Sequence, residues 1–197
     1  VIMLSQNKKS VGIIAIADTL KNGVSEVVAA LGKKKIEVWM ITGDNQRTAE
    51  AIAKSAGIKN VLAEMKPEQK ADKVREFKDI AFVGDGVNDA PALAASTVGL
   101  AMGTGTDVAI ESAGITLLNK DIKSVLTAFN LSRASMGVIK QNLFWAFGYN
   151  IILIPVAAGI LYPFTGWLLN PALAAFAMAA SSISVVANSL RLKSVKT

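Results

Sequence analysis

The chain has 197 residues, of which 52% are hydrophobic and only 18% are charged, a balance too apolar for an ordinary soluble domain. It contains no cysteine and no histidine, which excludes disulfides, Cys/His zinc sites and thiol chemistry within these residues. The net charge of +6 does not indicate nucleic acid binding, because the basic residues flank an apolar stretch, as they do in membrane proteins.

The first residues are expected to form a β-hairpin. The β-type run 11–17 follows the turn-like sequence Gln6-Asn7-Lys8-Lys9, so this hairpin would close a sheet formed by residues upstream. The apolar run 1–4 is too short for a signal peptide, and the chain is therefore expected to begin within a domain.

Helical and strand-like patterns then alternate along the chain. Helices are expected at 24–31, 48–56, 67–77, 90–95 and 107–112, and strands at 36–41, near 61, and at 80–83, 98–101 and 115–118. This alternation predicts an α/β fold with a parallel sheet wrapped by helices. Ligands of such sheets bind beyond the carboxyl ends of the strands, so the residues that follow each strand are the candidates for chemistry.

Three loops that follow predicted strands carry residues suited to phosphate. They are Thr42-Gly43-Asp44, Lys66-Pro67 and the run from Gly84-Asp85-Gly86 through Asn88-Asp89 to Pro91. A phosphoryl group in transfer is stabilised by hydroxyl and amide donors, by a lysine and by Mg²⁺ held on carboxylates. Thr42 and Gly43 fit the donor role, and Lys66 supplies a positive charge. Asp85, Asn88 and Asp89 offer the hard oxygen ligands that Mg²⁺ prefers.

Each loop also has an interpretation without chemistry. Thr-Gly-Asp is a common turn, Lys66 could be a solvated lysine at a helix start, and Asp89 could only cap the helix that Pro91 begins. For any loop alone that interpretation is preferred. The occurrence of all three, each after its own strand, favours phosphoryl chemistry.

The same loops resemble the phosphorylation-domain signatures of P-type ATPases, within the wider haloacid dehalogenase-like class. Asp18-Thr19-Leu20-Lys21 is similar to the hinge of that family, and the run 103–109 resembles a later loop of its phosphorylation domain. The resemblance implies a haloacid dehalogenase-like (Rossmann-like) fold. It implies that Thr42 contacts an aspartyl phosphate, that Lys66 neutralises it, and that Asp85 binds Mg²⁺. Asn88 and Asp89 would complete the site, with Asp44 as an orienting or loop residue.

The family transfers phosphate from ATP to an aspartate in the sequence Asp-Lys-Thr-Gly-Thr, which does not occur in this chain. The sheet is therefore expected to lack its central strand unless another segment supplies it. The resemblance implies the following division: 1–18, terminal hairpin of a nucleotide-binding domain; 19–125, part of the phosphorylation domain; 126–142, a cytoplasmic connecting helix; 143–190, two transmembrane helices; 191–197, a cytoplasmic tail.

The stretch from Gln141 to Leu190 contains no Asp, Glu, Lys or Arg. A membrane helix needs about 20 apolar residues, so two spans fit, at 143–161 and 171–190, with the aromatic segment 162–167 as the outer turn. Basic residues lie on both sides of this stretch and none lies in the turn, which predicts that both chain ends are cytoplasmic. These residues are Lys120, Lys123, Arg133 and Lys140 before it, and Arg191, Lys193 and Lys196 after it.

Polar side chains and a methionine lie within the predicted spans. Tyr149 and Asn150 are in the first, and Met178 and Ser182 are four residues apart in the second, on one helix face. Such residues commonly only hold helices together. A thioether beside amide and hydroxyl oxygens also suits a soft ion such as Cu⁺, and the absence of charge disfavours a divalent ion.

Tyr149-Asn150 and the run Met178 to Ser182 resemble signatures of the copper(I)-transporting branch of heavy-metal P-type ATPases. The resemblance implies part of an ATP-driven copper(I) export pump that uses Mg²⁺ and ATP and carries Cu⁺. Its partners would be the remainder of the pump (actuator domain, nucleotide-binding domain and earlier membrane helices), the lipid bilayer and a copper chaperone. The expected location is the plasma membrane of a bacterium or archaeon. The alternatives are a non-catalytic split or truncated half, a pump for Ag⁺ or Zn²⁺, and a membrane-anchored haloacid dehalogenase-like phosphatase.

Overall fold

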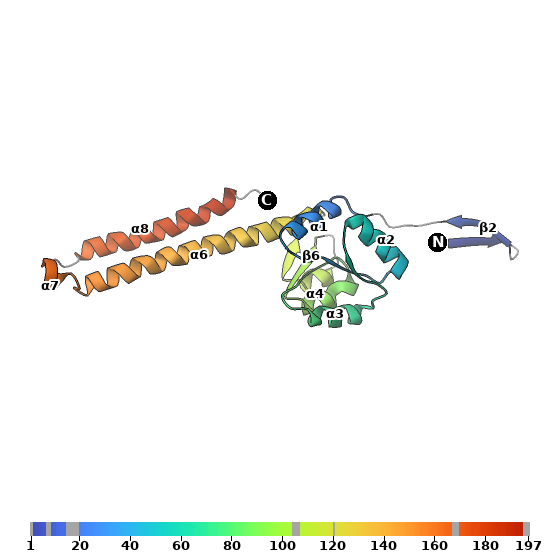
Figure 1. Cartoon of the computed structure of the whole chain (residues 1–197), viewed down its shortest axis with the longest axis horizontal. Helices are drawn as coiled ribbons and strands as arrows, with labels where there is room; N and C mark the ends of the chain where they lie inside the picture. Colours follow the sequence, from blue (N-terminus) through green and yellow to red (C-terminus); the bar gives the residue numbers. More distant parts are fainter. Residues whose placement is uncertain are drawn as a thin grey trace. The chain divides into compact units, whose positions relative to one another are not determined.

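The computed structural model describes residues 2–6, 9–14, 20–103, 107–119, 121–166 and 170–194. The chain divides into two compact units, Val1–Leu126 and Thr127–Thr197 (Figure 1). The predicted hairpin is confirmed: strand β1 (Ile2–Gln6) pairs antiparallel with β2 (Lys9–Ile14). Residues 15–17 of the expected strand, and the hinge residue Asp18, lie outside the described residues.

The predicted alternation of helices and strands is also confirmed. The elements in chain order are α1 (Val24–Lys33), β3 (Trp39–Ile41), α2 (Gln46–Ala56), β4 (Asn60–Leu62), α3 (Pro67–Glu76), β5 (Ala81–Gly84), η1 (Val87–Asp89), α4 (Ala90–Ala95), β6 (Val98–Met102), α5 (Asp107–Glu111) and β7 (Ile115–Leu117). Figure 1 shows strands β3 to β7 with the helices α1 to α4 around them.

Strand β3 is three residues shorter than the sequence predicts. The expected strand 36–41 begins only at Trp39, because the preceding residues end helix α1. The N–H of Ile36 donates back to the carbonyl of Leu31 at 3.1 Å, and Lys35 has a positive φ of 62°. The chain therefore makes a helix-terminating turn where the apolar pattern favoured a strand.

The parallel strands form two separate sheets. Strand β3 pairs with β4, and β5, β6 and β7 form a three-stranded sheet in that order. Within the described residues, β3 and β5 are not paired with each other, so each has one edge without a β-partner. The expectation that a strand is missing from the sheet stays a prediction.

Small side chains make up most of the interior of this unit. Leu93, Ala101 and Ala109 form a buried cluster, against which Phe82 and Ile110 pack. Small side chains allow helices α4 and α5 to approach strands β5 and β6 closely. Close packing of this kind places the loops at the ends of these strands on a rigid support.

The second unit is a helical hairpin. Helix α6 (Lys123–Ala157) begins in the first unit, and it is followed by α7 (Tyr162–Thr165), α8 (Pro171–Leu190) and η2 (Arg191–Ser194). The expected connecting range, 126–142, is helical, and helix α6 continues from it into the apolar stretch. The first predicted span, 143–161, is helical only to Ala157, since the chain turns at Gly159, where φ is 85°.

Among the described residues, one helix is long and apolar enough to cross a membrane by length and composition, Ala172–Ser194, with a mean hydropathy of 1.6. None of these residues is buried, which distinguishes this helix from the core helix of a soluble protein. Helix α6 does not meet the same criterion, because its apolar end also carries polar residues such as Asn142, Tyr149 and Asn150. The second span is therefore supported by composition, and the first stays a prediction.

Candidate functional site

The first candidate loop is closed by the side chains of Thr42 and Asp44. The hydroxyl of Thr42 donates to Oδ2 of Asp44 at 2.8 Å and accepts the N–H of Asp44 at 3.1 Å. The N–H of Thr42 donates to the carbonyl of Leu62 at 2.9 Å, which extends the β3–β4 ladder by one residue. Asp44 therefore orients the Thr42 hydroxyl at the end of β3, where Thr42 is half-buried and Asp44 is exposed.

The second loop is bonded to the first through its backbone. The N–H of Glu64 donates to the carbonyl of Asp44 at 2.8 Å, and the N–H of Met65 donates to the carbonyl of Thr42 at 3.0 Å. Lys66 comes next, with an exposed side chain. Its N–H donates to Oε1 of Gln69 at 2.9 Å, so Lys66 begins α3 in a defined conformation beside the Thr42 loop.

The third loop is held to helix α3 by an ion pair. Nζ of Lys70 lies 2.9 Å from Oδ1 of Asp89, and the two side chains are only 12% and 19% exposed. A Cβ atom on Gly84 would lie 2.7 Å from Cβ of Asp89, so only glycine fits this position without displacement. Asp89 is thus fixed between β5 and α3. Asn88 lies beside it in η1 with an exposed side chain.

Asp85 is accessible and has one ion-pair partner among the described residues. Nζ of Lys21 lies 3.1 Å from Oδ2 of Asp85, and both side chains are at least half exposed. The described residues contain no group of three or more acidic, histidine or cysteine side chains that could hold a metal alone. Mg²⁺ commonly uses one or two carboxylates together with water and a phosphate, so the donors Asp85, Asn88 and Asp89 fit it.

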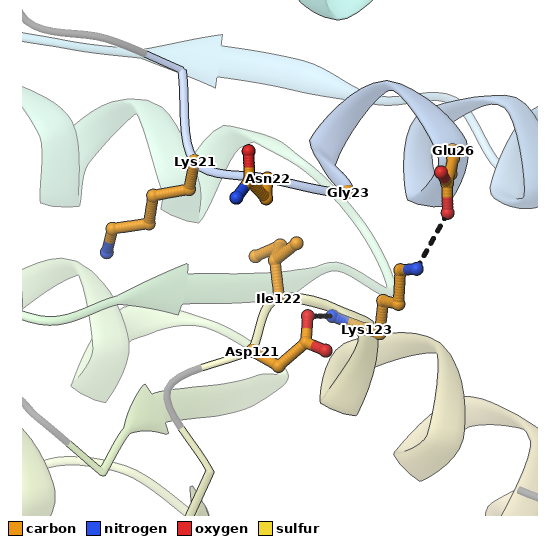
Figure 2. A pocket seen from close by; sticks show the side chains of 7 residues that line it. All are labelled: Lys21, Asn22, Gly23, Glu26, Asp121, Ile122 and Lys123. Carbon is orange, nitrogen blue, oxygen red and sulfur yellow. Dashed lines mark hydrogen bonds and ion pairs between the residues drawn. The ribbon is translucent and has the colours of Figure 1, made fainter.

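The segment that begins with Lys21 also lines an open pocket of about 590 Å³ at the start of α6. Figure 2 shows Lys21 directed away from a second ion pair in this pocket, between Nζ of Lys123 and Oε2 of Glu26 at 2.8 Å. The hydrogen bond to Glu26, followed by its negative charge, raises the pKa of Lys123 above its ordinary value of 10.5. Asp121 accepts the N–H of Lys123 at 2.9 Å and so begins the helix.

The three predicted loops are thus joined by observed bonds: Thr42 to Met65, Asp44 to Glu64, and Lys70 to Asp89. Sequence reasoning missed Lys70, although it lies one helical turn after Lys66, on the same face of α3. It also missed the pairing of Lys21 with Asp85, because those residues are 64 positions apart.

The residues predicted as copper ligands make bonds within their own helices. Nδ2 of Asn150 donates to the carbonyl of Ala146 at 2.9 Å, and the hydroxyl of Ser182 donates to the carbonyl of Met178 at 3.2 Å. Met178 is 69% exposed, and Asn150 and Ser182 are exposed as well. Tyr149 packs its ring on Trp145, with 6.0 Å between centroids. These side chains are thus available to groups outside the hairpin.

Comparisons with known proteins support the fold. A family model for haloacid dehalogenase-like hydrolases matches residues 2–97. The chain is 52% identical to a copper-exporting P-type ATPase of Legionella pneumophila, over 99% of this chain and 27% of that protein. It is 55% identical to a probable copper-transporting ATPase of Synechocystis, over 98% of this chain and 26% of that protein.

Among solved structures, a zinc-transporting PIB-type ATPase in its E2·Pi state matches with a TM-score of 0.84 and 34% identity. That match covers 96% of this chain and 31% of the other. The chain thus spans about a quarter of the length of the curated relatives it matches. Sequence identity over nearly the whole chain, together with the shared fold, shows that it belongs to the P-type ATPases.

Proposed function

We propose that this chain is part of an ATP-driven copper(I) export pump. It would supply the site at which an aspartyl phosphate forms and is hydrolysed, together with two membrane helices. The observation that carries this proposal is the joining of the Thr42, Lys66 and Asp89 loops at the carboxyl ends of β3, β4 and β5. A parallel α/β sheet binds its ligand at that edge.

The loops have separate roles in this proposal. The Thr42 hydroxyl, oriented by Asp44, and the N–H of Gly43 donate hydrogen bonds to the phosphoryl oxygens. Lys66 reaches the same oxygens from the start of α3 and neutralises their charge. Asn88 completes the loop, and Asp89, paired with Lys70, holds η1 beside β5. Because the loops that carry these groups are bonded to one another, little reorganisation is required during transfer.

Asp85 would hold Mg²⁺, with Asp89 as the second carboxylate. The ion supplies positive charge that stabilises the transferring phosphoryl group. Lys21 pairs with Asp85 at an exposed position, where an ion pair is weak. A divalent cation can therefore displace it at small cost.

The phosphorylated aspartate would come from a strand outside this chain. Within the part of the chain that the structure describes, β3 and β5 each have one edge without a β-partner, and an inserted strand can form a ladder with both. A parallel strand between them would end beside both Thr42 and Asp85, since these residues directly follow β3 and β5. The remainder of the pump is thus the expected partner, and it would also supply ATP binding.

The transported ion is proposed to be Cu⁺. Met178 offers a thioether, Asn150 and Ser182 offer neutral oxygens, and Tyr149 lies one residue before Asn150. The stretch from Gln141 to Leu190 contains no charged side chain, which disfavours a divalent ion such as Zn²⁺. The relatives at 52% and 55% identity are named as copper pumps, while the matched zinc-transporting structure is 34% identical. Both chain ends are proposed to be cytoplasmic, and the membrane to be a bacterial or archaeal plasma membrane.

The test uses the full-length pump that contains this chain. Acyl-phosphate formation from ATP is measured with and without Cu⁺, in the native pump and in the Asp85→Asn variant. Asp85→Asn is expected to reduce phosphorylation to background, because the amide lacks the charge that holds Mg²⁺. Asp79→Asn is the matched control, because Asp79 is an exposed turn residue with a positive φ that asparagine also adopts.

Met178→Leu tests the identity of the transported ion. It should weaken copper activation and leave phosphorylation by inorganic phosphate unchanged, while Met136→Leu, outside the apolar stretch, should change neither. Full activity of Asp85→Asn would refute the Mg²⁺ role. Phosphorylation of this chain alone would refute the placement of the acceptor aspartate outside it. A complete pump that forms no acyl phosphate would instead favour the non-catalytic alternative.

A further inference from the structure

A cluster of four polar side chains joins helices α6 and α8 near one end of the hairpin. We call it the carboxamide cluster; it consists of Gln141, Asn142, Asn188 and Ser189. Nδ2 of Asn188 donates to Oδ1 of Asn142 at 2.9 Å and to Oε1 of Gln141 at 3.2 Å. Nδ2 of Asn142 donates back to the hydroxyl of Ser189 at 3.0 Å. These bonds run between the helices in both directions.

The carboxamide of Asn188 is engaged at both its nitrogen and its oxygen. Oδ1 of Asn188 accepts from Nη1 of Arg191 at 3.2 Å, and the hydroxyl of Ser189 donates to the carbonyl of Val185 at 2.8 Å. Asn142, Asn188 and Ser189 are all half-buried. A network in which each amide has a defined donor and acceptor permits one alignment of the two helices, unlike apolar contacts, which tolerate sliding.

The cluster determines which residues of the two helices lie at the same level. Asn150 lies eight residues beyond Asn142, and Ser181 lies eight residues before Ser189. Antiparallel helices with an equal rise per residue therefore bring Asn150 level with Ser181, between Met178 and Ser182. The predicted copper ligands share one depth because of this register.

The same register places these residues on one flank of the hairpin. The half-buried positions of α8 recur at three- or four-residue intervals and face α6; they include Ala174, Ala177, Ser181 and Asn188. The matching positions of α6 include Asn142, Ala146 and Leu153. These half-buried positions form the contact surface between the two helices. Successive residues of a helix are rotated by about 100°, so Asn150 lies to one side of this contact surface, and Met178 and Ser182 lie to the same side.

We propose that Asn142 and Asn188 are positioning residues for ion transport: they hold α6 and α8 in the register that keeps Asn150 level with Met178 and Ser182. This inference rests on the proposed copper transport. A slip of one helical turn would move Asn150 by about 5 Å relative to Met178, more than a metal–ligand bond tolerates.

The test measures Cu⁺ activation and Cu⁺-independent phosphorylation in the full-length pump. Asn188→Leu removes every interhelical bond of Asn188 with little change of volume. It should raise the Cu⁺ concentration for half-maximal ATP hydrolysis by about three- to tenfold, because interhelical hydrogen bonds are modest. Phosphorylation by inorganic phosphate should stay unchanged, and Asn188→Gln, which keeps a carboxamide, should recover part of the copper affinity.

Ser184→Ala is the matched control. Ser184 is half-buried on α8, but its hydroxyl donates at 2.7 Å to the carbonyl of Ser181 in its own helix. It should leave copper activation unchanged. Wild-type copper activation in Asn188→Leu, or an equal loss in both readouts, would overturn the positioning role.

A second measurement does not depend on the identity of the ion. Nitroxide labels at Phe144→Cys and Val186→Cys, both exposed, report the distance between the helices. Asn188→Leu should broaden or shift that distance distribution, and an unchanged distribution would overturn the inference. If the native pump shows no copper response while the distances do shift, the proposed ion is wrong and the register role stands.

Discussion

Gly84→Ala should disturb the candidate phosphate site through a single methyl group. The new Cβ would lie 2.7 Å from Cβ and 3.0 Å from Oδ2 of Asp89, closer than carbon and oxygen atoms can approach. Asp89 must then move. It cannot move freely, because its carboxylate is bonded at 2.9 Å to Lys70 in a largely buried position. The methyl group therefore acts on the pair that joins β5 to α3.

The magnitude follows from these two contacts. Inserting a methyl group into a packed site costs about 1–3 kcal/mol, and weakening a charge-assisted hydrogen bond costs about 1.5–3 kcal/mol. The two costs overlap, since movement of Asp89 relieves the first at the expense of the second. We expect the free energy of unfolding of the first unit to fall by about 2–4 kcal/mol. Phosphorylation of the full pump should fall as well.

Trp39 fluorescence in a guanidinium titration measures this change. The ring of Trp39 packs edge-on against Phe77 with 5.1 Å between centroids, so its emission reports unfolding of the first unit. Trp145 and Trp167 are replaced by phenylalanine in all variants. Gly86→Ala is the control, because its Cβ would meet nothing closer than 3.9 Å. Equal stability of the two alanine variants would refute the steric argument.

Three further predictions concern the first unit. Gly23→Ala should lower the free energy of unfolding by about 1–2 kcal/mol, because Gly23 has a φ of 83° and an added Cβ would lie 2.9 Å from Cε of Lys123. The control is Gly32→Ala, which should not be destabilising, because no atom lies within 4 Å of the added Cβ. Asn45→Ala should cost about 1 kcal/mol, because Oδ1 of Asn45 accepts the N–H of Thr48 at 3.0 Å and caps α2, and an unchanged denaturation midpoint would contradict that role. Folding raises the pKa of Lys123, so the ion pair of Lys123 with Glu26 stabilises the fold below pH 10.5 and stops doing so as the pH rises through the higher pKa of the folded state. The difference in the free energy of unfolding between the native chain and Glu26→Gln should therefore shrink above pH 10.5. A difference that grows above pH 10.5 would contradict a raised pKa.

The local elements were predictable from the sequence because their signals are local. Helix α3 begins at Pro67 and helix α4 covers 90–95 as expected, since proline and apolar periodicity act over a few residues. The prediction failed at Ile36, where the end of α1 competes for the same backbone. At 126–142 the expected helix is present, and it continues into the apolar stretch because no strong helix breaker separates the two.

Some residues of the candidate site could be predicted from the sequence and others could not. Thr42, Lys66 and Asp85 could be found from the sequence, because each lies in a loop that follows a strand and carries a side chain suited to phosphate. The partners Lys70 and Lys21 could not be assigned, since their bonds to Asp89 and Asp85 cross 19 and 64 residues. Pairing over such separations depends on how helices lie against strands, which sequence spacing does not specify.

The sequence by itself determined the order of helices and strands, the phosphate-suited loops and the charge-free stretch, because each depends on neighbouring residues. Only the tertiary structure decided that three loops are bonded together, that β3 and β5 are not paired with each other among the described residues, and that Asn142 contacts Asn188. Asn142 and Asn188 are 46 residues apart in the sequence, and the hydrogen bonds between these side chains decide the register of helices α6 and α8. Apolar helices leave that register open, since lipid-facing and helix-facing surfaces are equally hydrophobic.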